Sequence, residues 1–346
     1  MERLISRKMK IAITDIYGKL YEKDKLFDAS TCKIGENLLV PIIKLKKSLE
    51  KNGHQFHTLD MYRWSEIDKI IFQEIPESIY TVETLDKKIK FGVKCILQKD
   101  YLFKSSRLLS ERDRILLIME PPAVAQKSYM KCYHKYFGKI LTWDDDLVDN
   151  KKYFKFYYPQ PIPQKRPYEK FQNKKEFVMI SGNKVSSHPN ELYSKRKNVV
   201  EYFETRNEQF DLYGFGWEKE NYKNYRGIVD NKLDTLSKYK YSICFENQQK
   251  VKGYITEKIF DCFFANCIPI YWGAANISDY IPENTFIDWR KFSSIEDMLL
   301  YVKNIKEEEY NEYLNNIEKF LNSEEFKKKF SVDAYIKNMT KIIMDK

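Results

Sequence analysis

The stretch from Tyr239 to Trp272 constrains the fold of this chain more than any other. Its two ends, residues 239–245 and 268–272, are apolar runs with the length and composition of buried strands. Between them, residues 257–267 are apolar on almost every side, as in a helix buried against a parallel sheet. The stretch therefore predicts a strand, a helix and a second strand of a parallel α/β sheet.

The start of this helix is the first candidate binding site. Thr256 is a good N-cap residue, and Glu257 and Lys258 follow it in the first turn. A helix N-terminus attracts anions, and this one opens at the carboxyl ends of the strands, where such domains bind ligands. A carboxylate that accepts ribose hydroxyls, beside an ammonium that holds a diphosphate, suits a sugar nucleotide. The alternative is an ordinary charged first turn.

Three segments around this helix resemble a known family. They read FEN at 245–247, GYITEKIFD at 253–261 and IPIYWGAANISDYIPENTFIDWRKF at 268–292, and they are similar to the donor-binding motif of the α-1,3-fucosyltransferases, glycosyltransferase family 10. The resemblance implies an α/β protein of the GT-B type, with two Rossmann-like doubly wound domains facing across a cleft and C-terminal helices packing back. It also implies an inverting enzyme that takes L-fucose from GDP-β-L-fucose.

The resemblance assigns expected roles to five residues of the motif. Tyr254 is expected near the base or the sugar, Glu257 at the ribose and Lys258 at the phosphates. Glu246 and Asn247 follow their strand and are expected to touch the fucose or the ribose. Because lysine, arginine and helix ends can offset the charge of the departing phosphate, no cofactor or metal site is expected, and a divalent cation is at most stimulatory.

A sixth donor-binding residue is expected upstream of the motif. Residues 177–181 predict a strand, which leads through a loop of small residues into a predicted helix at 191–205. The resembled family has an arginine in the matching unit, where its planar guanidinium can hold diphosphate oxygens. The text KRKN at 195–198 identifies Arg196, with a slip of one position to Lys195 or Lys197 as the alternative.

Glu120 is the predicted general base. It ends the apolar strand 114–119 and is followed by Pro121 and Pro122, which form a rigid turn. A carboxylate at the carboxyl end of a buried strand suits catalysis, whereas a solvent-exposed acid is the simpler interpretation. Enzymes of the resembled family have a catalytic glutamate in a similar turn, and this favours Glu120.

The acids Asp144, Asp145 and Asp146 support a competing interpretation. They follow an apolar strand, as does the DxD motif with which GT-A glycosyltransferases hold a divalent cation on the donor. A metal-dependent GT-A transferase for another sugar nucleotide is therefore the alternative. Against it, the basic donor motif lies far downstream, and no ligating histidine or further acid cluster follows.

Length and composition predict two domains. The chain has 346 residues, of which 43% are hydrophobic, and this is enough for two cores of common size. The Pro- and aromatic-rich segment 153–167 is the predicted linker. We therefore expect an acceptor-binding domain at 1–165, a GDP-fucose-binding domain at 166–306 and a helical extension at 307–346.

The remaining features concern surroundings and partners. The net charge of +10 favours acidic partners, but no nucleic-acid-binding signature is present. The chain starts without a secretory signal, contains no long apolar run and has dispersed cysteines, which predicts a cytoplasmic protein of bacterial type. The amphipathic extension either folds back over the first domain or contacts the inner membrane peripherally.

Together these features predict an α-1,3- or α-1,4-fucosyltransferase. Its expected partners are GDP-L-fucose and a GlcNAc-containing oligosaccharide of the N-acetyllactosamine type, and no nucleic acid is expected. The linkage and the acceptor follow from the resemblance alone. The alternative outside enzymes is a glycan- or nucleic-acid-binding module with a degenerate site.

Overall fold

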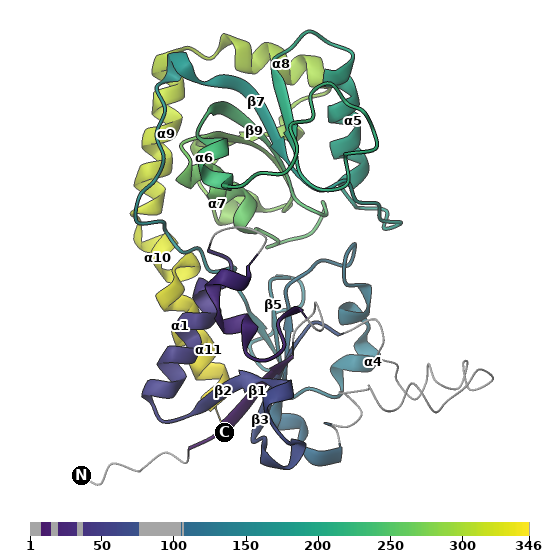
Figure 1. Cartoon of the computed structure of the whole chain (residues 1–346), viewed down its shortest axis with the longest axis vertical. Helices are drawn as coiled ribbons and strands as arrows, with labels where there is room; N and C mark the ends of the chain where they lie inside the picture. The colour runs from purple at the N-terminus through teal and green to yellow at the C-terminus, as the bar shows by residue number, and fades with distance from the viewer. Residues whose placement is uncertain (1–7, 15–19, 33–36, 76–104, 106, 346) are drawn as a thin grey trace, which may run out of the picture. The chain divides into compact units, whose positions relative to one another are not determined.

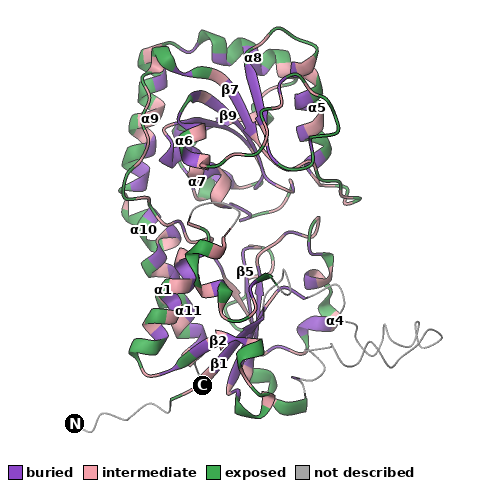
Figure 2. Cartoon of the chain, in the orientation of Figure 1, coloured by how far each residue is buried: buried purple, intermediate pink, exposed green. Residues whose placement is uncertain are grey.

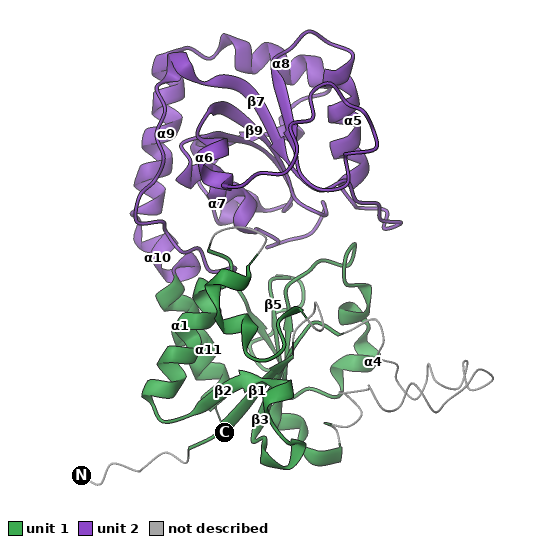
Figure 3. Ribbon diagram, in the orientation of Figure 1, with its two compact units in different colours: residues 1–157, 332–346 green, residues 158–331 purple. Residues whose placement is uncertain are grey.

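The chain folds into two compact units, each with its own sheet. The structure is a computed structural model, and it describes residues 8–14, 20–32, 37–75, 105 and 107–345. One unit contains residues 1–157 together with 332–346, and the other contains residues 158–331 (Figure 3). The chain thus leaves the first unit once, completes the second, and returns to the first for its last helix.

The first unit is built on a parallel sheet, of which six strands are described (Figure 1). In spatial order they are β2 (Gln55–Thr58), β1 (Lys10–Thr14), β3 (Lys69–Gln73), β4 (Arg114–Ile118), β5 (Lys139–Thr142) and β6 (Tyr153–Lys155). The strand order changes direction between β1 and β3. In a doubly wound sheet, this change of direction marks the edge at which ligands bind.

Helices cover the buried strands of this sheet, which Figure 2 shows in purple. Phe72 of β3 packs edge-on against Phe137, which follows the short helix α4 (Lys131–His134), with ring centroids 5.4 Å apart. The helix α1 (Val40–Lys51) buries Leu45 and Leu49 and lies against α11 (Val332–Met344). The apolar strands therefore have packing partners from both ends of the chain.

Two buried lysines fix the end of α11 to this sheet. Lys69, at the start of β3, donates to the carbonyl oxygen of Asp345 at 2.9 Å. Lys139, at the start of β5, donates to the carbonyl oxygen of Ile342 at 3.1 Å and lies 2.9 Å from Oδ2 of Asp345. A helix C-terminus carries unpaired carbonyl groups and partial negative charge, so the two ammonium groups stabilise it. The expected return of the C-terminal helices is confirmed for α11.

The second unit also contains a parallel sheet. In spatial order its described strands are β11 (Ile287–Asp288), β10 (Ile268–Trp272), β9 (Tyr239–Phe245), β7 (Lys175–Ile180) and β8 (Phe210–Tyr213). Its helices are α5 (Tyr193–Glu204), α6 (Lys232–Leu236), α7 (Glu257–Phe264), α8 (Ile295–Asn304), α9 (Glu307–Leu321) and α10 (Glu324–Phe330). The predicted strand–helix–strand unit is thus β9–α7–β10.

The central strand β9 separates two packed layers. Tyr241, Ile243 and Phe245 share a core with residues of α5 and α8. The alternate residue Cys244 meets Cys262 of α7 on the opposite face, because successive side chains of a strand point in opposite directions. Burial on both faces explains why the sequence of β9 is a continuous apolar run rather than an alternating one.

The units divide the chain differently from the sequence-based boundaries at 165 and 306. The first unit ends at Tyr157, because β6 pairs with β5 and draws part of the expected linker into the first sheet. The expected extension 307–346 is split, with 307–331 in the second unit and 332–346 in the first. Aromatic contacts hold α9 and α10 to the second unit: Phe260 and Phe263 of α7 contact Phe320, Phe326 and Phe330.

Three smaller findings complete the comparison with the sequence. The helix predicted from Glu191 begins at Tyr193, because the Glu191 carboxylate accepts a hydrogen bond from the Ser194 amide at 2.9 Å and caps the first turn from outside. The element predicted at 89–97 lies outside the described residues. Within the described part of the chain, no helix has both the length and the apolar character that crossing a membrane requires.

The packing of α11 leads to a stability prediction. Ile343 is 0% exposed, so Ile343→Ala should lower the free energy of unfolding by about 2–4 kcal/mol through lost burial and a residual cavity. Urea unfolding followed by circular dichroism measures the loss. Lys341→Ala, an exposed position on the same helix, is the matched control and should change the free energy by less than about 0.5 kcal/mol. Equal effects of the two substitutions would contradict the packing described for α11.

Candidate functional site

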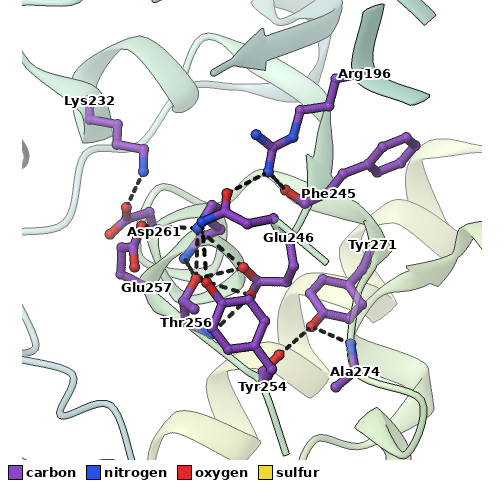
Figure 4. Close-up of polar contacts among 12 residues, drawn as sticks. Arg196, Lys232, Phe245, Glu246, Tyr254, Thr256, Glu257, Asp261, Tyr271 and Ala274 are labelled. Carbon is purple, nitrogen blue, oxygen red and sulfur yellow. Dashed lines mark hydrogen bonds and ion pairs between the residues drawn. The ribbon is translucent and has the colours of Figure 1, made fainter. Parts of the chain in front are cut away.

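The candidate site lies where β9 ends and α7 begins (Figure 4). The strand order of the second sheet changes direction between β7 and β9, so the carboxyl ends of these strands form its switch point. Thr256 is the N-cap of α7, as predicted, and its side chain accepts a hydrogen bond from the Lys258 amide. The helix therefore begins at the edge where a parallel sheet binds its ligands.

A buried carboxylate joins the strand to the helix. Glu246 directly follows β9 and is 0% exposed. Its Oε1 accepts a hydrogen bond from the Thr256 amide at 2.9 Å, and its Oε2 accepts one from the Thr256 hydroxyl at 2.8 Å. The ammonium of Lys258 lies 3.2 Å from Oε2 and compensates the charge. Because a buried charge without partners is costly, these contacts fix the start of α7 against the end of β9.

Lys258 presents a cation at the helix N-terminus. Its Nζ also donates to Oγ1 of Thr256 at 3.0 Å and lies 3.5 Å from Oε1 of Glu257. The side chain is 24% exposed, so part of it remains accessible from solvent. An anion at this end of α7 would meet the ammonium together with the unpaired N–H groups of the first turn.

Glu257 remains ionised next to this cation. Burial opposes its ionisation, but the positive charges of Lys258 and Lys232 outweigh burial and lower the pKa of Glu257 to about 2. Lys232 comes from α6 and pairs with Asp261, one turn farther along α7, at 2.6 Å. Burial favours the neutral form of Lys232, yet Asp261 and Glu257 outweigh it and raise its pKa. The first turns of α7 thus present fixed charges of both signs.

Arg196 reaches the same place from α5. Its Nη2 donates to the carbonyl oxygen of Phe245 at 2.6 Å and to Oδ1 of Asn247 at 3.1 Å, while its guanidinium lies 5.0 Å from the ring centre of Tyr193. Asn247 in turn donates to the hydroxyl of Tyr254 at 3.3 Å. Arg196 is only 4% exposed, so in this structure it braces the end of β9, and its contact with a diphosphate stays a prediction.

The structure brings together every donor-binding residue that the sequence predicted. They are Arg196, Glu246, Asn247, Tyr254, Glu257 and Lys258, and they lie in one region at the end of β9. Of the three candidates on α5, Arg196 reaches the end of β9, whereas Lys195 is exposed and Lys197 pairs with Glu220 at 3.6 Å. The individual roles of the six residues remain predictions.

A glycine makes room for the buried carboxylate. A Cβ at Gly273, which follows β10, would lie 2.5 Å from Cγ of Glu246 and 2.5 Å from the hydroxyl of Tyr271. The tyrosine cannot move away easily, because its hydroxyl accepts from the Ala274 amide at 3.2 Å and donates to the Tyr254 carbonyl at 3.4 Å. The position of Glu246 therefore requires glycine at 273.

The predicted base, Glu120, belongs to the first unit. It follows β4, and its amide donates to Oε1 of Glu74 at 2.6 Å. Its carbonyl oxygen accepts from the hydroxyl of Tyr129 at 2.9 Å. The next carbonyl, that of Pro121, accepts from the amides of Val124 and Ala125, which closes the turn. Both polar main-chain groups of Glu120 are thus fixed at the carboxyl end of its strand, as the sequence predicted.

Glu74 is a buried carboxyl to which the sequence assigned no role. It follows β3, is 1% exposed, and has a φ of 60°, in a region that residues other than glycine rarely occupy. Its Oε1 accepts from the amides of both Met119 and Glu120. Burial raises the pKa of Glu74 to about 7, although the Ser128 hydroxyl and the two amides act in the opposite direction. The signal in the sequence that could have identified Glu74 is an acid directly after a predicted strand.

The acids of the competing interpretation form a turn after β5. Asp145 pairs with Lys155 at 2.6 Å, and Oδ1 of Asp144 accepts from the amide of Asp146 at 3.0 Å. Burial raises the pKa of Asp144, and the neighbouring acids add to this effect. In the part of the chain that the structure describes, no three His, Cys, Asp or Glu side chains are grouped so that they could hold a metal ion.

The glycine next to Glu246 leads to a second prediction. Gly273→Ala should displace Glu246 from the Thr256 amide and lower the free energy of unfolding by about 1–3 kcal/mol, as overpacking does. Urea unfolding measures the change. Gly182→Ala is the matched control, because its nearest neighbour would be 3.6 Å away, and it should be close to neutral. A neutral Gly273→Ala would show that Glu246 is not held as described.

Solved glycosyltransferase structures share this fold. An α-1,3-fucosyltransferase solved with GDP-fucose covers 100% of this chain and 94% of its own, with a TM-score of 0.56 and 18% identity. An α-glucosyltransferase solved with UDP and DNA covers 98% and 100%, with a TM-score of 0.55 and 10% identity. At these identities the likeness concerns the fold, which is GT-B. This finding corrects the GT-A alternative drawn from Asp144–Asp146.

Curated relatives match over shorter segments. The α-(1,3)-fucosyltransferase FucT of Helicobacter pylori is 40% identical over 75 residues, which are 22% of this chain and 16% of the relative. The α-(1,4)-fucosyltransferase of Arabidopsis thaliana is 38% identical over 80 residues, 22% and 20% of the two chains. The chain therefore aligns with at most a fifth of the length of these two relatives.

A family model covers the whole of the candidate donor site. Residues 171–341 match the model described as glycosyltransferase family 10 (fucosyltransferase), C-terminal. The matched range contains Arg196, Lys258 and the elements that carry them, from β7 to most of α11. Through these residues the chain belongs to glycosyltransferase family 10, the fucosyltransferases.

Proposed function

We propose that this protein transfers L-fucose from GDP-β-L-fucose to a hydroxyl group of a GlcNAc-containing glycan, in an α-1,3 or α-1,4 linkage. The observation that carries the proposal is that the family match at 171–341 contains the complete network around Glu246, Glu257 and Lys258. The similar proteins include an α-1,3- and an α-1,4-fucosyltransferase, which supports both linkages. A similar fold solved with GDP-fucose supports the donor.

The charges of the network suit a nucleoside diphosphate sugar. The Glu257 carboxylate can accept hydrogen bonds from ribose hydroxyls, because its low pKa keeps it ionised at neutral pH. Lys258 and the N-terminus of α7 can take the diphosphate. When the bond between the fucose anomeric carbon and the β-phosphate oxygen breaks, negative charge grows on that oxygen, and Lys258 can stabilise it without a metal ion.

The acceptor needs a base, and Glu120 is the candidate. The acceptor oxygen attacks the anomeric carbon while its proton passes to the Glu120 carboxylate and GDP departs. Attack from the side opposite the leaving group converts the β-linked donor into an α-linked product. The fixed main chain of Glu120 favours this role, since a base must be held within hydrogen-bond reach of the proton it takes.

A sugar-nucleotide panel tests the proposed function. We expect GDP release and a fucosylated product with GDP-fucose and N-acetyllactosamine, and little or no reaction with UDP- or CMP-sugars. EDTA should leave the reaction largely intact. Lys258→Met should lower kcat/KM for GDP-fucose by about 100-fold, the size expected for one charge-stabilising group. Lys195→Met removes an exposed cation of α5 and is the matched control. Loss of transfer in EDTA, or activity with another donor alone, would refute the proposal.

A second experiment tests the base. Glu120→Gln keeps the shape of the side chain but cannot take a proton, so kcat should fall by about 100-fold or more while GDP affinity stays unchanged. Turnover assays and calorimetric titration with GDP measure the two quantities. Glu111→Gln, a 52% exposed carboxylate of the same unit, should behave as the unchanged protein. Near-normal turnover of Glu120→Gln would remove Glu120 from the mechanism.

A further inference from the structure

A glutamate follows each of two neighbouring strands of the first unit. Glu74 directly follows β3, and Glu120 comes shortly after the end of β4. The strands are parallel partners in the sheet, so their carboxyl ends lie side by side. The Glu74 amide also donates to the Leu117 carbonyl at 3.0 Å, which continues the pairing of the two strands to their ends. The two acids are therefore placed together by the register of the sheet.

The carboxyl group of Glu74 accepts hydrogen bonds from the main chain of the segment after β4. One oxygen, Oε1, accepts hydrogen bonds from two successive amides, those of Met119 and Glu120. A side chain that accepts from two adjacent amides holds the peptide plane between them in one orientation. From the other side, Tyr129 donates to the carbonyl oxygen of Glu120 at 2.9 Å. The direction in which the Glu120 side chain leaves the backbone is thereby determined.

The support behind Glu74 is itself buried and hydrogen-bonded. Ser128 is 0% exposed, and its Oγ accepts from the Ile75 amide at 2.9 Å. Its carbonyl oxygen accepts from Nε2 of His134 at 2.7 Å. A left-handed residue such as Glu74 is unfavourable unless its surroundings hold it, and such strain is concentrated at functional sites. These contacts hold the segment around Glu74 in its left-handed conformation.

We propose that Glu74 is a positioning residue for Glu120, which sets the place from which the Glu120 carboxylate takes the acceptor proton. This inference rests on the proposed function and adds a second acid to it. Glu74 itself touches no reacting atom in the scheme. Its effect on the reaction comes through the Glu120 main chain, and a displacement of about 1 Å at a catalytic group can cost on the order of 100-fold in rate.

The charge state of Glu74 adds a pH dependence to this arrangement. Its pKa of about 7 means that it loses its proton in the range where enzymes are assayed, and an ionised carboxylate is the stronger acceptor for the two amides. The other titratable groups nearby are Glu120, Tyr129, Asp144 and His134. Burial raises the pKa of Tyr129 well above its usual range and lowers that of His134. We therefore expect the pH profile of turnover to have a limb near pH 7, with turnover rising as Glu74 loses its proton, and the Glu74→Gln variant distinguishes Glu74 from Asp144, whose pKa burial also raises.

The test compares two substitutions of Glu74 in two backgrounds. Glu74→Ala removes the acceptor, so kcat should fall by about 30–100-fold with unchanged GDP affinity. Glu74→Gln keeps a carbonyl oxygen at the same place, so kcat should stay within about five-fold, but the limb near pH 7 should disappear. In the Glu120→Gln background, Glu74→Ala should cost less than about three-fold more, because residues that act through one another are not additive.

Several results would overturn the inference. These are a Glu74→Ala variant within three-fold of normal turnover, equal losses in the two backgrounds, or a Glu74→Gln variant with an unchanged pH profile. If Glu74→Ala does not fold, the pH profile of Glu74→Gln decides. Hydrogen exchange of the Met119 and Glu120 amides gives a readout that needs no substrate. Exchange should be faster in Glu74→Ala, which lacks the acceptor, and faster to a smaller extent in Glu74→Gln, whose neutral carbonyl oxygen is a weaker acceptor. Unchanged exchange in both variants would contradict the positioning. Absence of any fucosyl transfer by the unchanged protein would instead refute the proposed function.

Discussion

The carboxylate of Glu246 is the interaction on which the candidate donor site depends. It is completely buried at the end of β9, and it receives the amide and hydroxyl of Thr256 together with the ammonium of Lys258. A charge in this position is tolerated only when it is fully compensated, so strand, helix start and lysine must form together. The orientation of α7, and with it the placement of Glu257, follows from that requirement. The absence of a side chain at Gly273 provides the space.

Both units contain a buried glutamate at the end of a strand, but the two glutamates have different partners. In each, a buried glutamate directly follows a strand beside the switch point of a parallel sheet: Glu74 after β3 and Glu246 after β9. Glu246 is compensated by the ammonium of Lys258, and the pair places fixed charges of both signs at the start of α7. Glu74 accepts from two main-chain amides, and burial raises its pKa to about 7. The second arrangement orients a neighbouring main chain and can change its charge near neutral pH.

The family match covers almost all of the second unit and continues into α11 of the first. The match at 171–341 begins near the start of the second unit, and the described part of the first unit before Tyr157 lies outside it. A ligand-binding site constrains many side chains at once, because each part of a ligand needs partners of particular chemistry. The first unit follows the fold of a solved α-1,3-fucosyltransferase at low overall identity, which is what packing alone requires of a sheet and its helices.

The resemblance to a known family named the six candidate residues, of which Arg196 lies upstream of the motif, and the sequence by itself determined the parallel α/β class and the strand–helix–strand unit at 239–272. It could do so because apolar runs, an N-cap and a charged first turn are local signals, and the motif is contiguous. Only the tertiary structure decided that Lys232 faces α7, that Arg196 is buried behind Asn247, and where the C-terminal helices divide between the units. It alone placed the Glu74 carboxyl group within hydrogen-bond distance of the Glu120 amide. Strand register brings together residues that are distant in sequence, and no local pattern records such a pairing.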